Sequence, residues 1–159
     1  MGIKKKQLMV KQKIKTALIS VSDKTDLSKV LKTLSNYNVK IISSGGTYKS
    51  IKQLGYSCTE VSAYTGFKEM LDGRIKTLHP KIHAGILHDR SNKEHSKEMS
   101  KKKFPSLDLI IVNFYPFQKI VINSKSDKEI IESIDIGGPT MVRSAAKNYK
   151  NVLIITNKN

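Results

Sequence analysis

Residues 16–43 read TALISVSDKTDLSKVLKTLSNYNVKIIS, and this stretch decides the fold class of the chain. It opens with an apolar run at residues 16–21 that has the length of a buried strand. Apolar side chains then recur at helical spacing, at Leu27, Val30, Leu31 and Leu34. A second apolar run follows at residues 39–43, so the pattern predicts a strand, a helix and a second strand.

The same alternation continues along the chain. Gly45 and Gly46 predict a turn, and residues 47–54 predict a short helix that Gly55 stops. Three further strands are predicted, at residues 57–61, 107–112 and 152–156. Ser126 and Glu129 have the spacing of a capping box before a helix, and another helix is predicted at residues 140–148.

Strands that alternate with helices favour parallel pairing, because a parallel connection needs a crossover helix. Strands that are apolar along their whole length are typical of a sheet covered on both faces. The sequence therefore predicts a three-layer α/β fold with a mainly parallel five-stranded sheet and helices on both faces. In such sheets ligands bind beyond the carboxyl ends of the strands, near a topological switch point.

The composition limits the classes of protein to consider. The 159 residues fit one domain, at residues 15–159, after a basic extension at residues 1–14 that we expect to be mobile. No apolar run is long enough to cross a membrane, so no membrane partner is expected. The single cysteine, Cys58, cannot form an internal disulfide and is most simply a small buried residue. Without a signal peptide, these features favour the cytoplasm.

The formal net charge of +16 would suit nucleic acid. Only three of the 29 basic residues are arginines, however, and base reading and phosphate clamping favour the arginine fork. The lysines gather in the first 15 residues and at residues 93–103, which we interpret as a solvated tail and a surface loop or helix. We therefore expect no specific nucleic-acid partner.

Two polar turns follow the first two predicted strands. The first, residues 20–25, supplies hydroxyls and Lys24 at the entry to a helix, and the second, residues 43–47, supplies paired glycines and hydroxyls. Helix N-termini and glycine turns both suit anions. Ordinary capping by Ser22, Asp23 or Thr25, and a tight turn capped by Thr47, are the alternatives. Two such turns at neighbouring strand ends favour a phosphate-bearing ligand.

Other candidates lie further along the chain. Arg74 and Arg143 fall in motif-like segments where a lysine-biased chain nevertheless has arginine. His79 and His83 have the spacing of a metal pair on a helix, but Pro80 lies between them and no further ligands are near in sequence, so no metal is expected.

Asn113 and Tyr115 end the fourth strand, where Phe114 and Phe117 are interpreted as core or lid residues. Residues 134–140 predict a loop that exposes amides beside Asp135. The default interpretation of Arg143 and Lys147, one turn apart, is a solvated helix face.

Five segments occur together in this chain: SVSDKT, SSGGT, TGFKEMLDGRIKTLHPKIHAGIL, NFYPF and IDIGGPTMVRSAAKN. In this order they resemble the IMP cyclohydrolase family, whose domain forms the N-terminal part of bifunctional purine biosynthesis proteins. The resemblance covers about residues 15–156. It implies a methylglyoxal-synthase-like fold and dehydrative ring closure of formyl-AICAR ribotide to IMP, without cofactor or metal.

The resemblance also implies a site. Its catalytic residues would be Lys147, Asp135, Tyr115 and Lys76, with Lys147 as the proton donor or acceptor. The phosphate would contact residues of the two polar turns: Ser22, Lys24, Ser44, Gly45, Gly46 and Thr47. The base or ribose would contact Arg74, Lys76, Thr77 and Asn113. The substrate-binding set is completed by Asp23, Ile75, Asp135, Ile136 and Gly137.

The chain also departs from the family. Asp26 stands where a glycine commonly follows the DKT triplet, which places a carboxylate near the expected phosphate turn. The lysine-rich leader is additional, and the chain ends where the family continues, so we expect a truncated cyclohydrolase domain without the transformylase domain.

The resemblance implies a homodimer. A nucleotide-binding regulatory module without turnover is the alternative from another class, and methylglyoxal synthase is a weaker enzymatic one.

Overall fold

The computed structural model describes residues 13–124 and 126–157. Its sheet has five strands, all parallel, in the spatial order β3-β2-β1-β4-β5. The strands are β1 (Thr16–Val21), β2 (Lys40–Ser43), β3 (Thr59–Glu60), β4 (Leu109–Asn113) and β5 (Leu153–Ile155). The central strand β1 pairs with both β2 and β4, and Leu18 faces Ile42 on one side and Ile110 on the other. This order confirms the predicted parallel α/β fold.

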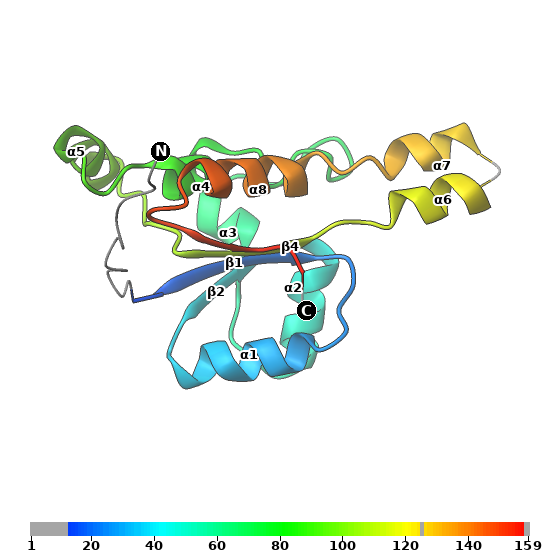
Figure 1. The fold of residues 1–159 in the computed structure, drawn as a ribbon, viewed down its shortest axis with the longest axis horizontal. Helices are drawn as coiled ribbons and strands as arrows, with labels where there is room; N and C mark the ends of the chain where they lie inside the picture. Colours follow the sequence, from blue (N-terminus) through cyan, green and yellow to red (C-terminus); the bar gives the residue numbers. More distant parts are fainter. Residues whose placement is uncertain (1–12, 125, 158–159) are drawn as a thin grey trace, which may run out of the picture.

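Helices connect the strands and cover both faces of the sheet (Figure 1). They are α1 (Leu27–Asn36), α2 (Gly45–Gln53), α3 (Val61–Thr65), α4 (Pro80–Leu87), α5 (Lys93–Lys101), α6 (Phe117–Asn123), α7 (Asp127–Glu132) and α8 (Gly137–Lys147). No helix in the described ranges is long and apolar enough to cross a membrane.

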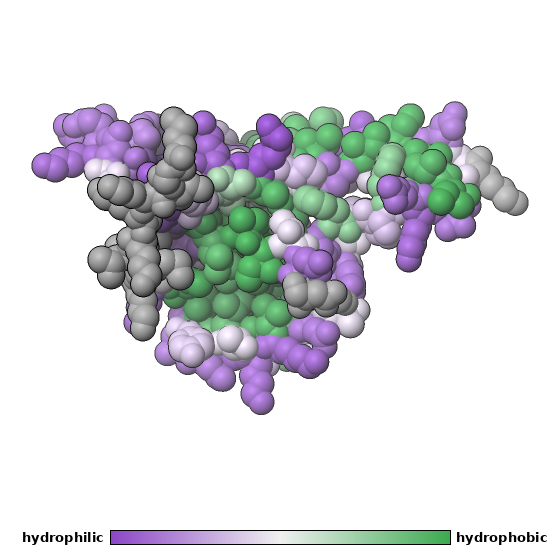
Figure 2. Space-filling model, viewed as in Figure 1, coloured by the Kyte–Doolittle hydropathy of each residue, from purple (hydrophilic) through white to green (hydrophobic). Residues whose placement is uncertain are grey.

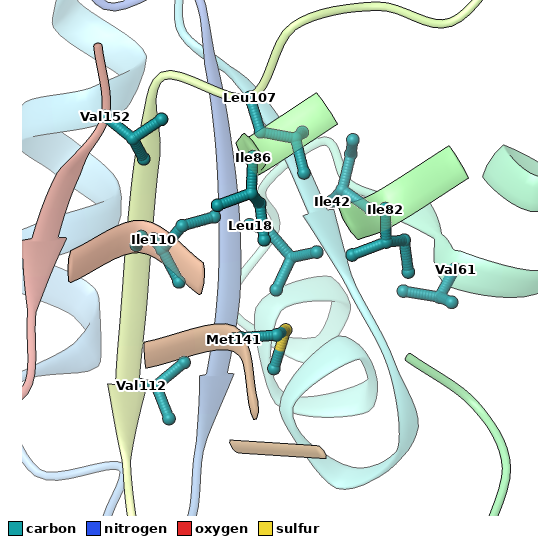
Figure 3. Close-up of a cluster of buried hydrophobic side chains, with 11 residues drawn as sticks. Leu18, Ile42, Val61, Ile82, Ile86, Leu107, Ile110, Val112, Met141 and Val152 are labelled. Carbon is teal, nitrogen blue, oxygen red and sulfur yellow. The ribbon is translucent and has the colours of Figure 1, made fainter. Parts of the chain in front are cut away.

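Alternation along the strands divides the core into two clusters. Ala17 and Ile19 of β1 face one way and pack with Leu31 of α1 and Ile51 of α2. Leu18 of β1 faces the other way and packs with residues of α4 and α8 (Figure 3). The members of this second cluster in Figure 3 include Ile82, Ile86, Ile110 and Met141, all completely buried. The two clusters make the three layers that the sequence predicts.

Several predicted boundaries are wrong in an instructive way. Gly45 and Gly46 form the first turn of α2 rather than a turn before it, and Gly137 and Gly138 likewise begin α8 rather than a loop. The third strand is only two residues long because Val61 turns into α3. The capping box does not form, since Glu129 accepts a hydrogen bond from Ser124 Oγ at 2.6 Å and the Ser126 side chain caps nothing. At α2 and α8, tertiary contacts of Thr47 and Thr77 hold the glycines in a helix, and at residues 124–129 a local hydrogen bond replaces the capping box.

Helices α6 and α7 form an arm at residues 114–136 that extends past the carboxyl edge of the sheet (Figure 1). Neither helix has a buried residue, and Ile122 and Ile131 are 80% and 58% exposed. The apolar side chains give the arm an extensive apolar surface in Figure 2. Helices of this length are marginal alone, so the arm is typical of an element that packs on another surface.

Candidate functional site

The sheet order places a switch point between β1 and β4. From β1 the chain builds β2 and β3 on one side and then returns to β4 on the other. The loop after β1 therefore meets the end of β4 at the carboxyl edge of the sheet, where Val21 pairs with Asn113. This is the position where open α/β sheets bind ligands.

Asn113 fixes the first polar turn at that point. Its Oδ1 accepts hydrogen bonds from the backbone amides of Ser22 (2.6 Å) and Asp23 (3.0 Å), and its Nδ2 donates to the Asp23 carbonyl at 2.8 Å. Asp23 Oδ1 accepts from both the amide and the hydroxyl of Thr25. The side chains of Ser22, Asp23 and Thr25 therefore do not cap α1, whose N-cap is Asp26. The predicted contact residue Asn113 thus shapes the turn, with its amide group already engaged.

The second polar turn lies against the first. Thr47 is buried inside α2, and its hydroxyl accepts from the Val21 amide at 3.1 Å and donates to the Val21 carbonyl at 2.9 Å. These two hydrogen bonds hold the N-terminus of α2 at the end of β1. Gly45 has a left-handed φ of 54°, which favours glycine, and a Cβ built on Gly46 would lie 3.9 Å from Lys24 Nζ. The first turn of α2 therefore has accessible backbone at Gly46, with the Lys24 ammonium close to it.

Lys76 is a second lysine at this helix terminus. A Cβ on Gly45 would lie 3.5 Å from Lys76 Nζ, and the ammonium pairs with Glu69 at 2.9 Å. The chain reverses between these two residues at Asp72–Gly73, where Met70 and Ile75 form an antiparallel bridge. Two ammonium groups thus stand near free helix amides, an arrangement that suits an anion.

A cleft of about 650 Å³ opens beside this terminus. Gly45 and Gly46 line it on one side and Lys76 on another. A further wall comes from the end of β3, from α3 and from the segment after it, including Glu60, Ser62, Phe67 and Glu69. The volume lies within the usual range for small-molecule sites.

The residues of this wall were not predicted as site residues, and Glu69 is the most informative of them. Asp72–Gly73 is a common hairpin turn, and pairing outward from Met70 and Ile75 brings Glu69 opposite Lys76. The Asp-Gly dipeptide could therefore have predicted the ion pair. Glu60, Ser62 and Phe67 carry no comparable pattern, because their place depends on how α3 packs.

Asp135 and Thr77 meet at the start of α8. Asp135 Oδ1 accepts from the Gly138 amide at 2.9 Å, so its charge lies at the positive end of the helix. Thr77 is buried, and a Cβ on Gly137 would lie 2.5 Å from Thr77 Oγ1. Gly137 therefore permits close contact between α8 and the segment that carries Lys76. Ile136, the N-cap of α8, is 54% exposed.

Arg74 does not point into the cleft. Its guanidinium pairs with Glu132 of α7, and hydrogen bonding to Arg74 lowers the pKa of Glu132. The pair connects the turn at residues 70–75 with the arm. The next residue, Ile75, is part of the bridge to Met70.

The aromatic residues after β4 are more exposed than predicted. Phe114 and Phe117 are 44% and 40% exposed, so neither is a core residue of the chain, and Tyr115 is 55% exposed. They form the base of the arm, where β4 leads into α6. The core interpretation is therefore wrong within a single chain, because the arm carries these rings away from the sheet, and the lid interpretation stays a prediction.

Lys147 lies at the opposite end of α8 from Asp135. The helix rises about 15 Å from Gly137 to Lys147 and runs back toward the amino edge of the sheet, where β5 begins (Figure 1). Lys147 and Arg143 line a groove of about 520 Å³ with Leu87. The groove and the cleft at Gly45 have no lining residue in common. One chain therefore brings together Lys24, Lys76, Gly45 and Gly46, but not Lys147.

The two histidines of the candidate metal pair have separate roles. His79 caps α4, accepting from the Lys81 amide through Nδ1 at 3.1 Å, and His83 Nδ1 lies 3.2 Å from Ser144 Oγ. Among residues 13–124 and 126–157, no three His, Cys, Asp or Glu side chains form a group that could hold a metal.

Two other sequence features lie outside the cleft. Burial raises the pKa of the half-buried Cys58 to about 11, in keeping with a packing role. Asp26 pairs with Lys29 of α1 at 2.8 Å. Residues 1–12, most of the predicted basic extension, lie outside the described ranges.

Comparison with known proteins agrees with this architecture. The chain is 50% identical over 143 residues to the bifunctional purine biosynthesis protein PurH of Acetivibrio thermocellus, which covers 89% of this chain and 28% of that protein. It is 51% identical over 146 residues to PurH of Clostridium acetobutylicum, covering 92% of the chain and 29% of that protein. The chain thus spans less than a third of these relatives.

The crystal structure of ForH superposes with a TM-score of 0.77 and 28% identity, covering 89% of this chain and 72% of that one. The model of the MGS-like domain matches residues 26–140, which include both polar turns, the Lys76 segment and Asp135. The fold, the switch-point site and this match agree, and the chain belongs to the MGS-like domain family.

Proposed function

We propose that the chain is an IMP cyclohydrolase domain that binds a purine nucleotide at the carboxyl edge of the sheet and closes the ring of formyl-AICAR ribotide. The observation that carries the proposal is the convergence of Lys24 and Lys76 on the exposed first turn of α2. Its position beside a cleft of nucleotide size and the similarity to PurH support it further. The reaction would take place in the cytoplasm, as a step of purine biosynthesis.

The phosphate would bind to the two polar turns. Amides at residues 44–47 and the ammonium groups of Lys24 and Lys76 can donate to its oxygens, and the hydroxyls of Ser22 and Ser44 lie at the same strand ends. The base would extend toward Thr77 and Asp135 at the start of α8. Asn113 would act by holding the Ser22–Asp23 turn in place.

The chemistry of ring closure requires a base and a source of positive charge. The carboxamide nitrogen attacks the formyl carbon as it loses a proton, and Asp135 would accept that proton. The formyl oxygen then becomes negative, and the amides of Ile136 and Gly137 would stabilise it. Loss of one such donor typically costs about 100- to 1000-fold in rate. One proton converts the formyl oxygen into a hydroxyl and a second lets it leave as water, while the former formamide nitrogen gives up its proton as the new C=N bond forms. Asp135, Tyr115 and a lysine would carry these protons.

Lys147 would reach this site from a second copy of the chain. It stands at the far end of α8, about 15 Å along the helix axis from Gly137. We therefore propose a homodimer in which Lys147 of one chain completes the site of the other. The exposed apolar arm beside the cleft supplies a surface on which two chains could pack.

The proposed sharing of Lys147 has a direct test. Lys147→Ala and Lys24→Gln are made separately, and each chain should be inactive alone. Mixed chains form heterodimers in which one site keeps both lysines, so activity should return to as much as about a quarter of the wild-type value, because half of the dimers are mixed and each has one intact site. No recovery after verified subunit exchange would contradict the shared site.

A nucleotide-binding module without turnover is the second candidate. It is favoured by the separation of the phosphate-binding groups from Lys147, since one chain holds the first set without the second. The absorbance change on mixing with formyl-AICAR ribotide tests turnover, and calorimetry with IMP tests binding. Turnover that Asp135→Asn reduces about 100-fold or more supports the enzyme. IMP binding without turnover supports the module, and absence of both contradicts the site.

A further inference from the structure

His83 lies behind the proposed nucleotide site without belonging to it. It is a half-buried residue of α4, and its ring lies between α8 and the segment that carries Lys76 and Thr77. Its Nδ1 is 3.2 Å from Ser144 Oγ of α8. The ring is therefore placed to act on the site from its inner side.

The hydrogen bonds determine which ring nitrogen carries the proton. Ser144 Oγ lies 2.8 Å from the Thr140 carbonyl and donates its single hydrogen there. It must therefore accept from His83, so Nδ1 is protonated in the neutral ring and Nε2 carries a lone pair. His83 Nε2 is buried and has no hydrogen-bond partner among the described residues.

The backbone carbonyl of Thr77, which already accepts a hydrogen bond from the His79 amide at 2.9 Å, is the polar group that raises the pKa of the imidazole. It interacts with the imidazole and favours the protonated ring, whereas burial, the larger effect, lowers the pKa of His83. When the ring is neutral, both Nε2 and the Thr77 carbonyl are hydrogen-bond acceptors, so they cannot bond to each other. A proton on Nε2 would turn one acceptor into a donor and join the two groups.

Thr77 connects this position to the cleft. Its hydroxyl lies against Gly137 at the start of α8, and its neighbour Lys76 lies beside Gly45 of α2. A new hydrogen bond to the Thr77 carbonyl would therefore affect both the start of α8 and the position of Lys76 beside α2.

We propose that His83 is a positioning residue for the nucleotide site: through Nδ1 it is fixed to α8, and through protonated Nε2 it binds the Thr77 carbonyl and holds Lys76 toward the phosphate. The proposal rests on the proposed function, because it assigns a role in nucleotide binding. The protonated state binds the anionic nucleotide more tightly, since the segment is fixed and a positive charge is added behind Lys76.

Several charged or titratable side chains lie on the elements around His83. On α4, Lys81 donates to the Tyr64 carbonyl and His79 caps the helix. On the Thr77 segment Lys76 pairs with Glu69, and on α8 Arg143 and Lys147 line the groove that Ser144, the partner of His83, also lines. Burial and the Thr77 carbonyl are accordingly the causes of the shift in the pKa of His83.

Two substitutions separate the two nitrogens. His83→Asn keeps a donor near the position of Nδ1 and removes Nε2, whereas His83→Gln keeps an uncharged donor near Nε2. His95→Asn, on the exposed helix α5, is the control for removal of a histidine. IMP binding is measured by calorimetry at about pH 7.5 and about pH 5.5 for all four proteins.

From the higher to the lower pH, the affinity of the wild type for IMP should rise about fivefold relative to His83→Asn, at the low end of coupling between linked sites. Titration of the IMP phosphate affects every variant equally and cancels in that ratio. His83→Gln should show no histidine-dependent step and the His95→Asn control should follow the wild type. Equal pH dependence in the wild type and His83→Asn would overturn the proposal.

Nitrogen NMR of the free protein decides the matter without any nucleotide. The expected spectrum has Nδ1 protonated and Nε2 bare at neutral pH, with the Leu78 amide, which follows the Thr77 carbonyl, shifting at the same midpoint as His83. A proton on Nε2 at neutral pH would contradict the proposed role of His83. So would a Leu78 amide whose chemical shift does not change as His83 titrates. Loss of IMP binding in every protein at both pH values would instead refute the proposed function, with the NMR result still standing.

Discussion

Gly45 and Gly46 are neighbours in the first turn of α2, yet they should respond differently to alanine. At Gly46 the new methyl group meets only the end of Lys24 at 3.9 Å, so we expect an unchanged or slightly higher Tm. The methyl group would stand where phosphate approaches the backbone, so IMP affinity should fall about tenfold, or about 1.4 kcal/mol. Thermal unfolding and calorimetry measure the two effects. A Gly46→Ala protein that binds IMP like the wild type would exclude α2 as the phosphate site.

At Gly45 the cost should appear in stability. Its φ of 54° is left-handed, and an alanine there should destabilise the fold by about 1–2 kcal/mol. Gly55→Ala is the matched control, because Gly55 has a φ of 81° with nothing within 4 Å of its Cβ position. Denaturant unfolding should give similar losses for both variants, whereas only Gly45→Ala should also weaken IMP binding. Equal binding by the two variants would contradict the site.

Helix α8 is held to the sheet by its buried face, which includes Met141. Met141→Ala should lower the free energy of unfolding by about 2–5 kcal/mol, because it opens a cavity among completely buried side chains (Figure 3). Tyr37→Ala, at a position 73% exposed beyond α1, is a control that should change stability by less than about 0.5 kcal/mol. Urea unfolding measures both, and similar values for the two variants would mean that α8 does not pack as described.

The arm is tied to the turn at residues 70–75 by Arg74 and Glu132. Because Arg74 lowers the pKa of Glu132, the pair stabilises the fold above the unfolded pKa of glutamate, about 4.3, and this contribution disappears as the pH falls through the lower folded value. Both side chains are exposed, so the effect should be small and sensitive to salt. Thermal unfolding of the wild type and Glu132→Gln should differ at neutral pH in low salt and converge in acid. A difference that persists in acid would point to another cause.

Regular elements were predictable where their residues bury an apolar face. Strand β1 and helix α1 follow the patterns of residues 16–34, and the lysine-rich stretch at residues 93–103 contains α5. Helices α6 and α7 have no buried residue, so the sequence of α6 shows no helical periodicity of apolar residues. The starts of α2 and α8 were placed two to three residues late because paired glycines indicate turns unless tertiary contacts, here those of Thr47 and Thr77, hold them in a helix.

At the scale of the whole molecule, the apolar arm predicts association. Ile122 is 80% exposed, and Ile122→Glu should shift the proposed homodimer toward the monomer by placing a charge in the contact. Tyr149→Glu, at a residue 69% exposed outside the arm, is the control that should leave the mass unchanged. Sedimentation gives the mass of each species. A monomeric wild type, or a dimer that Ile122→Glu leaves intact, would contradict a dimer built on the arm.

The candidate site was predictable only in part, for a reason of geometry. Spacing along the sequence identified the polar residues at the end of each strand, and parallel strands gather those residues at one edge, as Ser22, Gly45 and Asn113 show. Lys147 lies at the end of a helix that returns to the other edge, so the sequence places it in the same motif as Asp135 while the fold separates the two. A sequence motif that covers the whole helix does not say in which direction the helix runs across the sheet.

The arm begins directly after Asn113 and ends directly after Asp135, so both of its ends adjoin residues of the proposed site. Any ligand that favours one placement of these ends must also favour one orientation of the arm, and thermodynamic reciprocity then applies. Nucleotide should strengthen self-association by the same factor by which self-association strengthens nucleotide affinity. Assembly would thereby depend on the concentration of the ligand bound at the proposed site.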